Sequence, residues 1–158
     1  MRPSHAPLRL ATGAYILNSG LAKRGVDGTT AAGLQAMGAG AIPQLGKVSP
    51  KTFVAGLSSG EIALGAVLLA PFVSPVLAGA ALTAFGAGLV QVYLKTPGMT
   101  EPGSVAPTQN GVGLAKDIWL VGAGLTLLVD GLADETRRTT RRTTKKAKKA
   151  LAQVTPGH

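Results

Sequence analysis

The chain has 158 residues, a formal net charge of +9, 22 glycines and no cysteine. Without cysteine it holds no disulfide, no zinc–thiolate site and no cysteine nucleophile. Its two histidines, His5 and His158, lie near the chain ends, which disfavours a histidine-based catalytic triad or metal site. We therefore expect no metal and no cofactor. Whether the protein is an enzyme stays open, and the composition favours a protein without catalytic activity.

The first apolar stretch covers residues 7–22 and is short for a membrane span. Arg9 interrupts it, and we expect this side chain to reach back to the lipid headgroups from near the helix end. An alternative interpretation is a cleaved signal peptide, because Arg2 precedes the apolar centre and small residues follow it at Gly20 and Ala22.

Three further apolar stretches cover residues 53–70, 75–94 and 111–129. At about 1.5 Å per residue, stretches of roughly 18–20 residues cross a hydrocarbon core of about 30 Å. The sequence thus predicts an all-α fold, a bundle of four transmembrane helices. Residues 1–134 form this membrane domain in our prediction, and residues 135–158 form a basic, disordered cytoplasmic tail.

The connections carry capping and breaking signals. Ser74 and Pro75 are typical of a helix start, and Pro71 ends the preceding helix, so a tight turn joins two antiparallel spans. In the first loop, Asp27 or Thr29 starts a short helix outside the membrane, through Met37, that ends at Gly38 and Gly40. Prolines predict an extended loop over residues 95–112.

The distribution of cations predicts the orientation. Four spans place both termini on one side, together with Arg2, Arg9 and eight Lys and Arg residues of the segment 131–158. Six cations fall on the other side. Because positive charge is enriched on the cytoplasmic side, we expect a multi-pass protein of the cell membrane with both termini cytoplasmic.

Four segments of the chain resemble segments of a known membrane-protein family. They occur in the order and at the spacing that this family shows. They are LRLATGAYILNSGLAKRG at 8–25, AAGLQAMGAGAIP at 31–43, GEIALGAVLLAP at 60–71 and GLAKDIWLVGAGLTLLVDG at 113–131. Together they resemble DoxX-like membrane proteins. The resemblance implies a four-helix integral membrane fold, and some members are linked with quinone-dependent or thiol and sulfur redox complexes. A thiol mechanism within this chain is excluded, because it has no cysteine.

Glu61 is the strongest single candidate for a functional residue, as a proton or ligand site. A carboxylate in the hydrocarbon region is costly unless it is paired, protonated or turned into the bundle. We expect it to face the bundle interior, with Asn18, Ser19, Lys23 or Lys116 as its partner. The predicted polar cleft opens away from the cytoplasm. The residues predicted to line it are Asn18, Lys23, Glu61, Gln91 and Lys116, with Lys95 and Asp117 at the same level.

Small residues four apart, Gly56 with Gly60 and Ala84 with Gly88, predict close helix contacts. Packing within the chain is the first interpretation, and a contact in a homo- or hetero-oligomer is the alternative. The tail cations are predicted to lie on anionic lipid. They include Arg137, Arg138, Arg141, Arg142, Lys145 and Lys146. Nucleic-acid binding is disfavoured, because no aromatic residue is interleaved with them.

Three functions remain. We first expect a non-catalytic or accessory subunit that packs beside a larger membrane complex, because the chain is small and has no cofactor ligands. A quinone- or redox-linked membrane subunit follows from the family resemblance alone. A small lipid- or solute-binding membrane protein is the third alternative, and it would use the polar cleft around Glu61.

Overall fold

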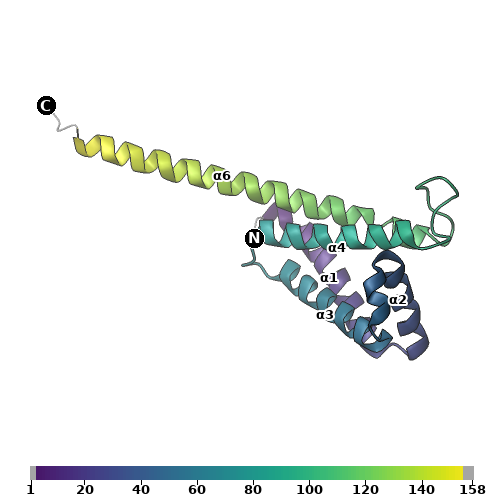
Figure 1. The fold of residues 1–158 in the computed structure, drawn as a ribbon. Helices are drawn as coiled ribbons and strands as arrows, with labels where there is room; N and C mark the ends of the chain where they lie inside the picture. Colours follow the sequence, from purple (N-terminus) through teal and green to yellow (C-terminus); the bar gives the residue numbers. More distant parts are fainter. Residues whose placement is uncertain (1–2, 155–158) are drawn as a thin grey trace.

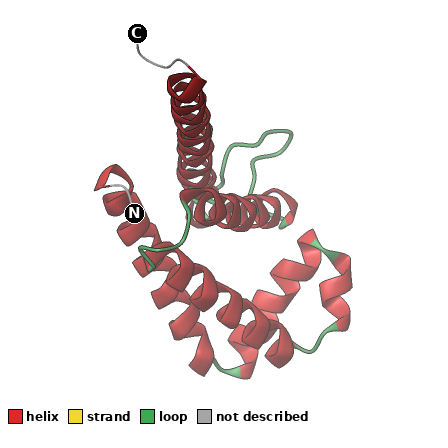
Figure 2. Cartoon of the chain, turned by 90° about the vertical axis from the view of Figure 1, so that its left-hand side faces the viewer, coloured by secondary structure: helices red, strands yellow, loops and turns green. Residues whose placement is uncertain are grey.

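The computed structural model describes residues 3–154. This part of the chain is helical and contains no β-strand, apart from one isolated bridge between Thr100 and Pro107 (Figure 2). In chain order the α-helices are α1 (Ala6–Ala22), α2 (Gly28–Ala41), α3 (Pro50–Leu69), α4 (Pro75–Lys95), α5 (Val112–Ala115) and α6 (Ile118–Val154) (Figure 1). Short 3-10 turns cover Pro3–His5, Lys23–Gly25 and Pro43–Lys47.

The polar residues expected to start helices do so. Ser74 accepts a hydrogen bond from the backbone N–H of Leu77, and Ser49 caps α3 in the same way. Asp27 caps α2, and the hydrogen bonds that it accepts from Thr30 and Thr29 hold the pKa of this exposed carboxyl below its ordinary value. The end predicted for α2 is too early. The helix runs on to Ala41, because Gly38 provides room for the Phe53 ring rather than stopping the helix.

Three helices are long and apolar enough to cross a membrane. They are α3, α4 and the segment Val112–Ala147, which contains α5 and most of α6. The first of the four predicted spans corresponds to α1, which has only 17 residues and lies along α3. The structure therefore supports a membrane protein with three apolar helices of spanning length, and the count of four stays a prediction.

The helices are arranged as two pairs, α1 with α3 and α4 with α6. Glycines let the backbones approach within each pair. A Cβ atom at Gly65 of α3 would lie 2.7 Å from the backbone nitrogen of Leu17 in α1. A Cβ atom at Gly79 of α4 would lie 2.5 Å from the backbone nitrogen of Leu128 in α6. Each pair is thus held at a separation that larger residues at these positions would not allow.

The small residues predicted to make these contacts are the wrong ones. A Cβ atom at Gly56, Gly60 or Gly88 would meet nothing within 4 Å, and Ala84 is exposed. The small-xxx-small pattern does not say which face of a helix it occupies, and both predicted faces point outward. The contact glycines are Gly13, Gly20, Gly65, Gly79, Gly86, Gly124 and Gly131.

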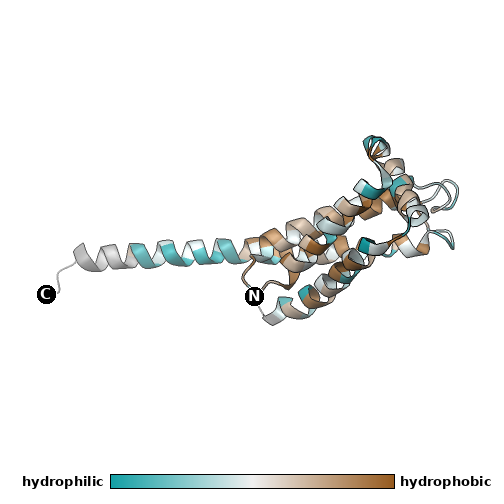
Figure 3. Ribbon diagram, turned by 90° about the horizontal axis from the view of Figure 1, so that it is seen from below, coloured by the Kyte–Doolittle hydropathy of each residue, from teal (hydrophilic) through white to brown (hydrophobic). Residues whose placement is uncertain are grey.

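The two pairs meet in one apolar core. Ile16 of α1 and Leu64 and Leu68 of α3 join Leu82 of α4 and Leu127 of α6 there. Mostly apolar residues form the bundle around this core, whereas the far half of α6 is hydrophilic (Figure 3). The core therefore lies along the part of α6 that has spanning hydropathy.

The predicted disordered tail is wrong for the described residues. The last helix, α6, continues without a break through Val154 and projects from the bundle as a rod (Figure 1). Between residues 132 and 154 there is no glycine or proline to stop it, and cations near a helix C-terminus are favourable. The domain boundary predicted at residue 134 thus falls inside a helix. Arg2 and His158 lie outside the described residues.

The start of α1 lies beside the point at which α6 leaves the bundle. Nε2 of His5 is 3.1 Å from Oδ2 of Asp130. The side chain of His5 is buried, and that of Asp130 is half exposed. This contact places the beginning of the chain and the base of the projecting helix at the same end of the bundle.

Candidate binding cavity

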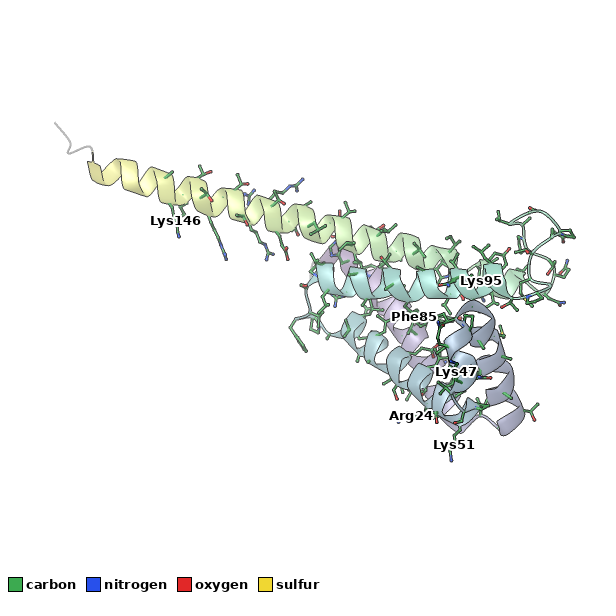
Figure 4. The ribbon with its side chains drawn as sticks, in the orientation of Figure 1. Arg24, Lys47, Lys51, Phe85, Lys95 and Lys146 are labelled. Atoms are coloured by element: carbon green, nitrogen blue, oxygen red, sulfur yellow. The ribbon has the colours of Figure 1, made fainter. Side chains whose placement is uncertain are left out.

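A cavity of about 230 Å³ lies at the other end, where α1, α2, α3 and α4 meet the segment that begins α6. At roughly 30 Å³ per water molecule, it has room for about seven waters or one small organic group. Three aromatic and many aliphatic side chains form most of its wall, and four polar or charged side chains interrupt it. The principal lining residues are Tyr15, Ile16, Phe53, Leu57, Phe85, Leu89 and Leu120, with Ser19, Lys23, Glu61 and Asp117. Figure 4 labels Phe85 on α4, near the end where α2 packs.

Glu61 and Lys23 form a largely buried ion pair in this wall. Nζ of Lys23 lies 2.8 Å from Oε2 of Glu61 and 2.7 Å from Oγ of Ser19. A third, longer contact of 3.4 Å runs from Nζ to the carbonyl oxygen of Ser19. The three ammonium hydrogens therefore each have an acceptor. The predicted burial of Glu61 and its pairing with Lys23 are both present, with Glu61 only 4% exposed.

The close approach of α1 and α3 positions this pair. A Cβ atom at Gly20 would lie 2.9 Å from Cβ of Glu61, so a larger residue there would push the carboxylate away. One turn earlier on α3, the buried hydroxyl of Ser58 donates a 2.7 Å hydrogen bond to the carbonyl oxygen of Gly20. Gly20 and Ser58 together fix the position of α1 along α3. This alignment places Lys23 beside Glu61.

Asp117 was predicted at the level of the polar cleft, and the structure places it in the cavity wall. It is 8% exposed and lines the cavity from the junction of α5 and α6, yet its carboxylate makes no hydrogen bond within the described residues. Its backbone N–H bonds to the carbonyl oxygen of Leu114, and α6 begins at the next residue. The break between α5 and α6 turns this side chain inward. The Lys116–Asp117 pair at the start of an apolar stretch was the available signal.

The remaining residues of the predicted cleft are not brought to Glu61. Asn18 and Lys116 are exposed. Gln91 instead donates a 3.3 Å hydrogen bond to the carbonyl oxygen of Ala41, at the end of α2, and Lys95 contacts the same oxygen at 3.4 Å. These two residues of α4 hold the end of α2 against the bundle, so the helix that covers the cavity is tied to α4.

Arg9 was expected at the headgroups and is instead fully buried. Its guanidinium donates four hydrogen bonds of 2.8–3.0 Å to backbone carbonyl oxygens at the end of α3 and in the turn that follows. The acceptors are Val67, Leu68, Ala70 and Val73. The last carbonyls of a helix lack intrahelical partners and carry partial negative charge. Arg9 therefore ties α1 to the far end of α3, away from the cavity.

Two open grooves flank the cavity. One, between α3 and α4, is almost entirely apolar and includes Gly56, Gly60 and Phe85 in its wall. The other lies between the segment Lys23–Ala31 and the start of α3, and exposed Arg24 and Lys51 line it. Figure 4 shows both cations at the end of the molecule where α2 lies. In comparisons with family models, curated proteins and solved structures, nothing matches this chain. The resemblance to DoxX-like proteins thus stays a prediction.

Proposed function

We propose that this chain is a non-catalytic integral membrane protein that binds a small apolar or amphipathic ligand in the cavity beside Glu61. One observation carries the proposal, namely a cavity of about 230 Å³ at the junction of the two helix pairs. Apolar walls with a few convergent polar groups are the usual composition of a ligand site.

We further propose four spans, with both termini cytoplasmic. The contact between His5 and Asp130 supports this, because it places the start of α1 level with the end of the apolar part of α6. The projecting part of α6 then carries its cations into the cytoplasm, in agreement with the positive-inside rule. A cysteine introduced at Gln109, in a chain without native cysteine, should react with an impermeant reagent from outside the cell. A cysteine at Thr136 should not.

The binding proposal is tested with neopentylbenzene, a small neutral probe, and the full chain in lipid nanodiscs. Equilibrium dialysis against empty nanodiscs measures partition into lipid, and the protein should retain about one further molecule per chain. Leu89→Trp should abolish this excess, because Leu89 lines the cavity. Leu94→Trp, on an exposed position of the same helix, should leave it unchanged. No excess in the wild-type chain would overturn the proposal.

A role as an accessory subunit is the second candidate. The outward-facing Gly56 and Gly60 support it, because a neighbouring helix could approach the open groove between α3 and α4 closely. Gly60→Trp should then release a protein that co-purifies in mild detergent, whereas Phe72→Trp, in an exposed turn, should retain it. A quinone-linked role rests on the family resemblance alone.

We also propose that the projecting half of α6 binds anionic lipid. Three cation pairs, at 137–138, 141–142 and 145–146, recur every four residues, so they share about half of the helix circumference. Cations near an anionic leaflet gain about 1 kcal/mol each, and salt weakens this attraction. Deleting residues 136–158 should leave the bundle inserted and remove salt-dependent retention of anionic lipid. A truncated chain that fails to insert would contradict this role.

A further inference from the structure

The charges in the cavity wall do not balance. Glu61 and Asp117 contribute two carboxylates, whereas Lys23 contributes one ammonium group. Lys23 lies within 4 Å of Glu61 and is paired with it, and no ion pair joins it to Asp117 within the described residues. When both carboxyl groups are ionised, the cavity thus has one negative charge without a counter-charge in the wall.

Asp117 is a largely buried residue in the cavity wall. Its side chain is more than nine-tenths buried, lines the cavity and accepts no hydrogen bond from the described residues. An isolated buried carboxylate is costly, and proteins ordinarily supply a cation or donors for it. Lys116 is adjacent in the chain, but its side chain is exposed. A cationic ligand in the cavity would supply the direct partner that the described side chains do not.

The rest of the wall is suited to the apolar part of a cationic ligand. Phe53, Phe85 and Tyr15 present aromatic rings, which attract organic cations through their faces. Exposed cations such as Lys51 and Lys95 lie at the same end of the molecule. Salt screens exposed charges over about 8 Å, whereas a buried carboxylate is screened much less. A cation inside the cavity thus meets the Asp117 carboxylate directly, whereas the exposed cations act on it through screening solvent.

We propose that the cavity takes a small hydrophobic organic cation, such as an aromatic or aliphatic ammonium compound, with Asp117 as its counter-ion. This inference rests on the proposed binding function and adds the chemical class of the ligand. Glu61 has a weaker role, because Lys23 already neutralises it. The unpartnered carboxylate is what distinguishes this site from an ordinary apolar void.

The experiment compares three probes of similar size with the full chain in nanodiscs of neutral lipid. They are the cation benzyltrimethylammonium, its neutral isostere neopentylbenzene and the anion phenylmethanesulfonate. The wild-type chain should bind the cation and not the anion. Asp117→Asn should weaken cation binding at least tenfold and leave neopentylbenzene binding unchanged, which also shows that the cavity is intact.

Glu101→Gln is the matched control, because it removes the same charge from an exposed position in the loop between α4 and α5. It should leave cation binding unchanged. Equal cation binding by Asp117→Asn and the wild-type chain would overturn the inference, as would preferential binding of the sulfonate. If neopentylbenzene alone binds, the inference fails while the proposed function stands. If no probe binds, both fail.

Discussion

The two helix pairs are held together in different ways. Between α1 and α3, polar side chains add to the close glycine packing, through Arg9, Ser58 and the Lys23–Glu61 pair. Within the described residues, no side-chain hydrogen bond joins α4 to α6. The hydroxyl of Thr83 instead donates a hydrogen bond within its own helix. Glycine backbones pack directly between these two helices. The α1–α3 pair therefore contributes Lys23 and Glu61 to the cavity wall, whereas the α4–α6 pair contributes mainly apolar side chains, with Asp117 just before α6.

The largest effect is expected from removing the Arg9 guanidinium. Arg9→Met removes a donor from four carbonyl oxygens at the end of α3 and in the turn that follows. Ala70 keeps a second donor, the backbone N–H of Val73, and a buried carbonyl left without a donor costs about 1–3 kcal/mol. We expect a loss of at least about 3 kcal/mol in the free energy of unfolding. Unfolding in mixed micelles with increasing dodecyl sulfate, followed by circular dichroism, measures it.

Arg9→Lys is the matched variant. It keeps the charge but has three donors rather than five, so its stability should lie between those of Arg9→Met and the wild-type chain. Equal stability of all three chains would show that the carbonyl contacts do not hold α1 against α3.

Gly124→Ala, in the α4–α6 pair, should lower the free energy of unfolding by a smaller amount. The new Cβ atom would lie 2.5 Å from the backbone nitrogen of Thr83 and would force α4 and α6 apart. Such overpacking costs about 1–3 kcal/mol. Gly122→Ala, on the same helix, meets nothing within 4 Å and should be neutral or slightly stabilising. The same micelle titration compares them, and equal stability would argue against direct backbone packing.

The smallest effect is expected from Ser58→Ala, which removes the bond to the carbonyl oxygen of Gly20. We expect a loss of about 1 kcal/mol. Ser59→Ala, at the next and exposed position, should lie within about 0.5 kcal/mol of the wild-type chain. If Ser59→Ala lowers the free energy of unfolding as much as Ser58→Ala does, the hydrogen bond between Ser58 and Gly20 does not account for the loss.

The sequence predicts the helices better than it predicts their contacts. Apolar length and the caps at Asp27 and Ser74 act locally, so the helix starts follow from neighbouring residues. Which glycines face a partner depends on how two helices rotate against each other, and the prediction that Gly56 and Gly60 pack within the chain was wrong. The same global geometry turns Asp117 inward.

The continuation of α6 was missed for a different reason. Disorder was predicted because the tail is highly charged and has little apolar surface to bury. A helix that has already started needs only one further backbone hydrogen bond per residue, so it can continue without burial. A partner for Glu61 was predictable because a buried carboxylate needs one, but depth in the membrane did not distinguish Lys23 from Lys116.

A double-mutant cycle on Glu61 and Lys23 tests most directly whether polar contacts fix the α1–α3 pair and its cavity. Stability in mixed micelles is measured for Glu61→Gln, Lys23→Met, the double variant and the wild-type chain. The 2.8 Å contact between the two largely buried groups predicts a coupling free energy of about 1–3 kcal/mol. A control cycle combines Glu101→Gln with Lys23→Met, and the effects of these two substitutions on stability should be additive. Additivity for Glu61 and Lys23, within about 0.5 kcal/mol, would contradict the account.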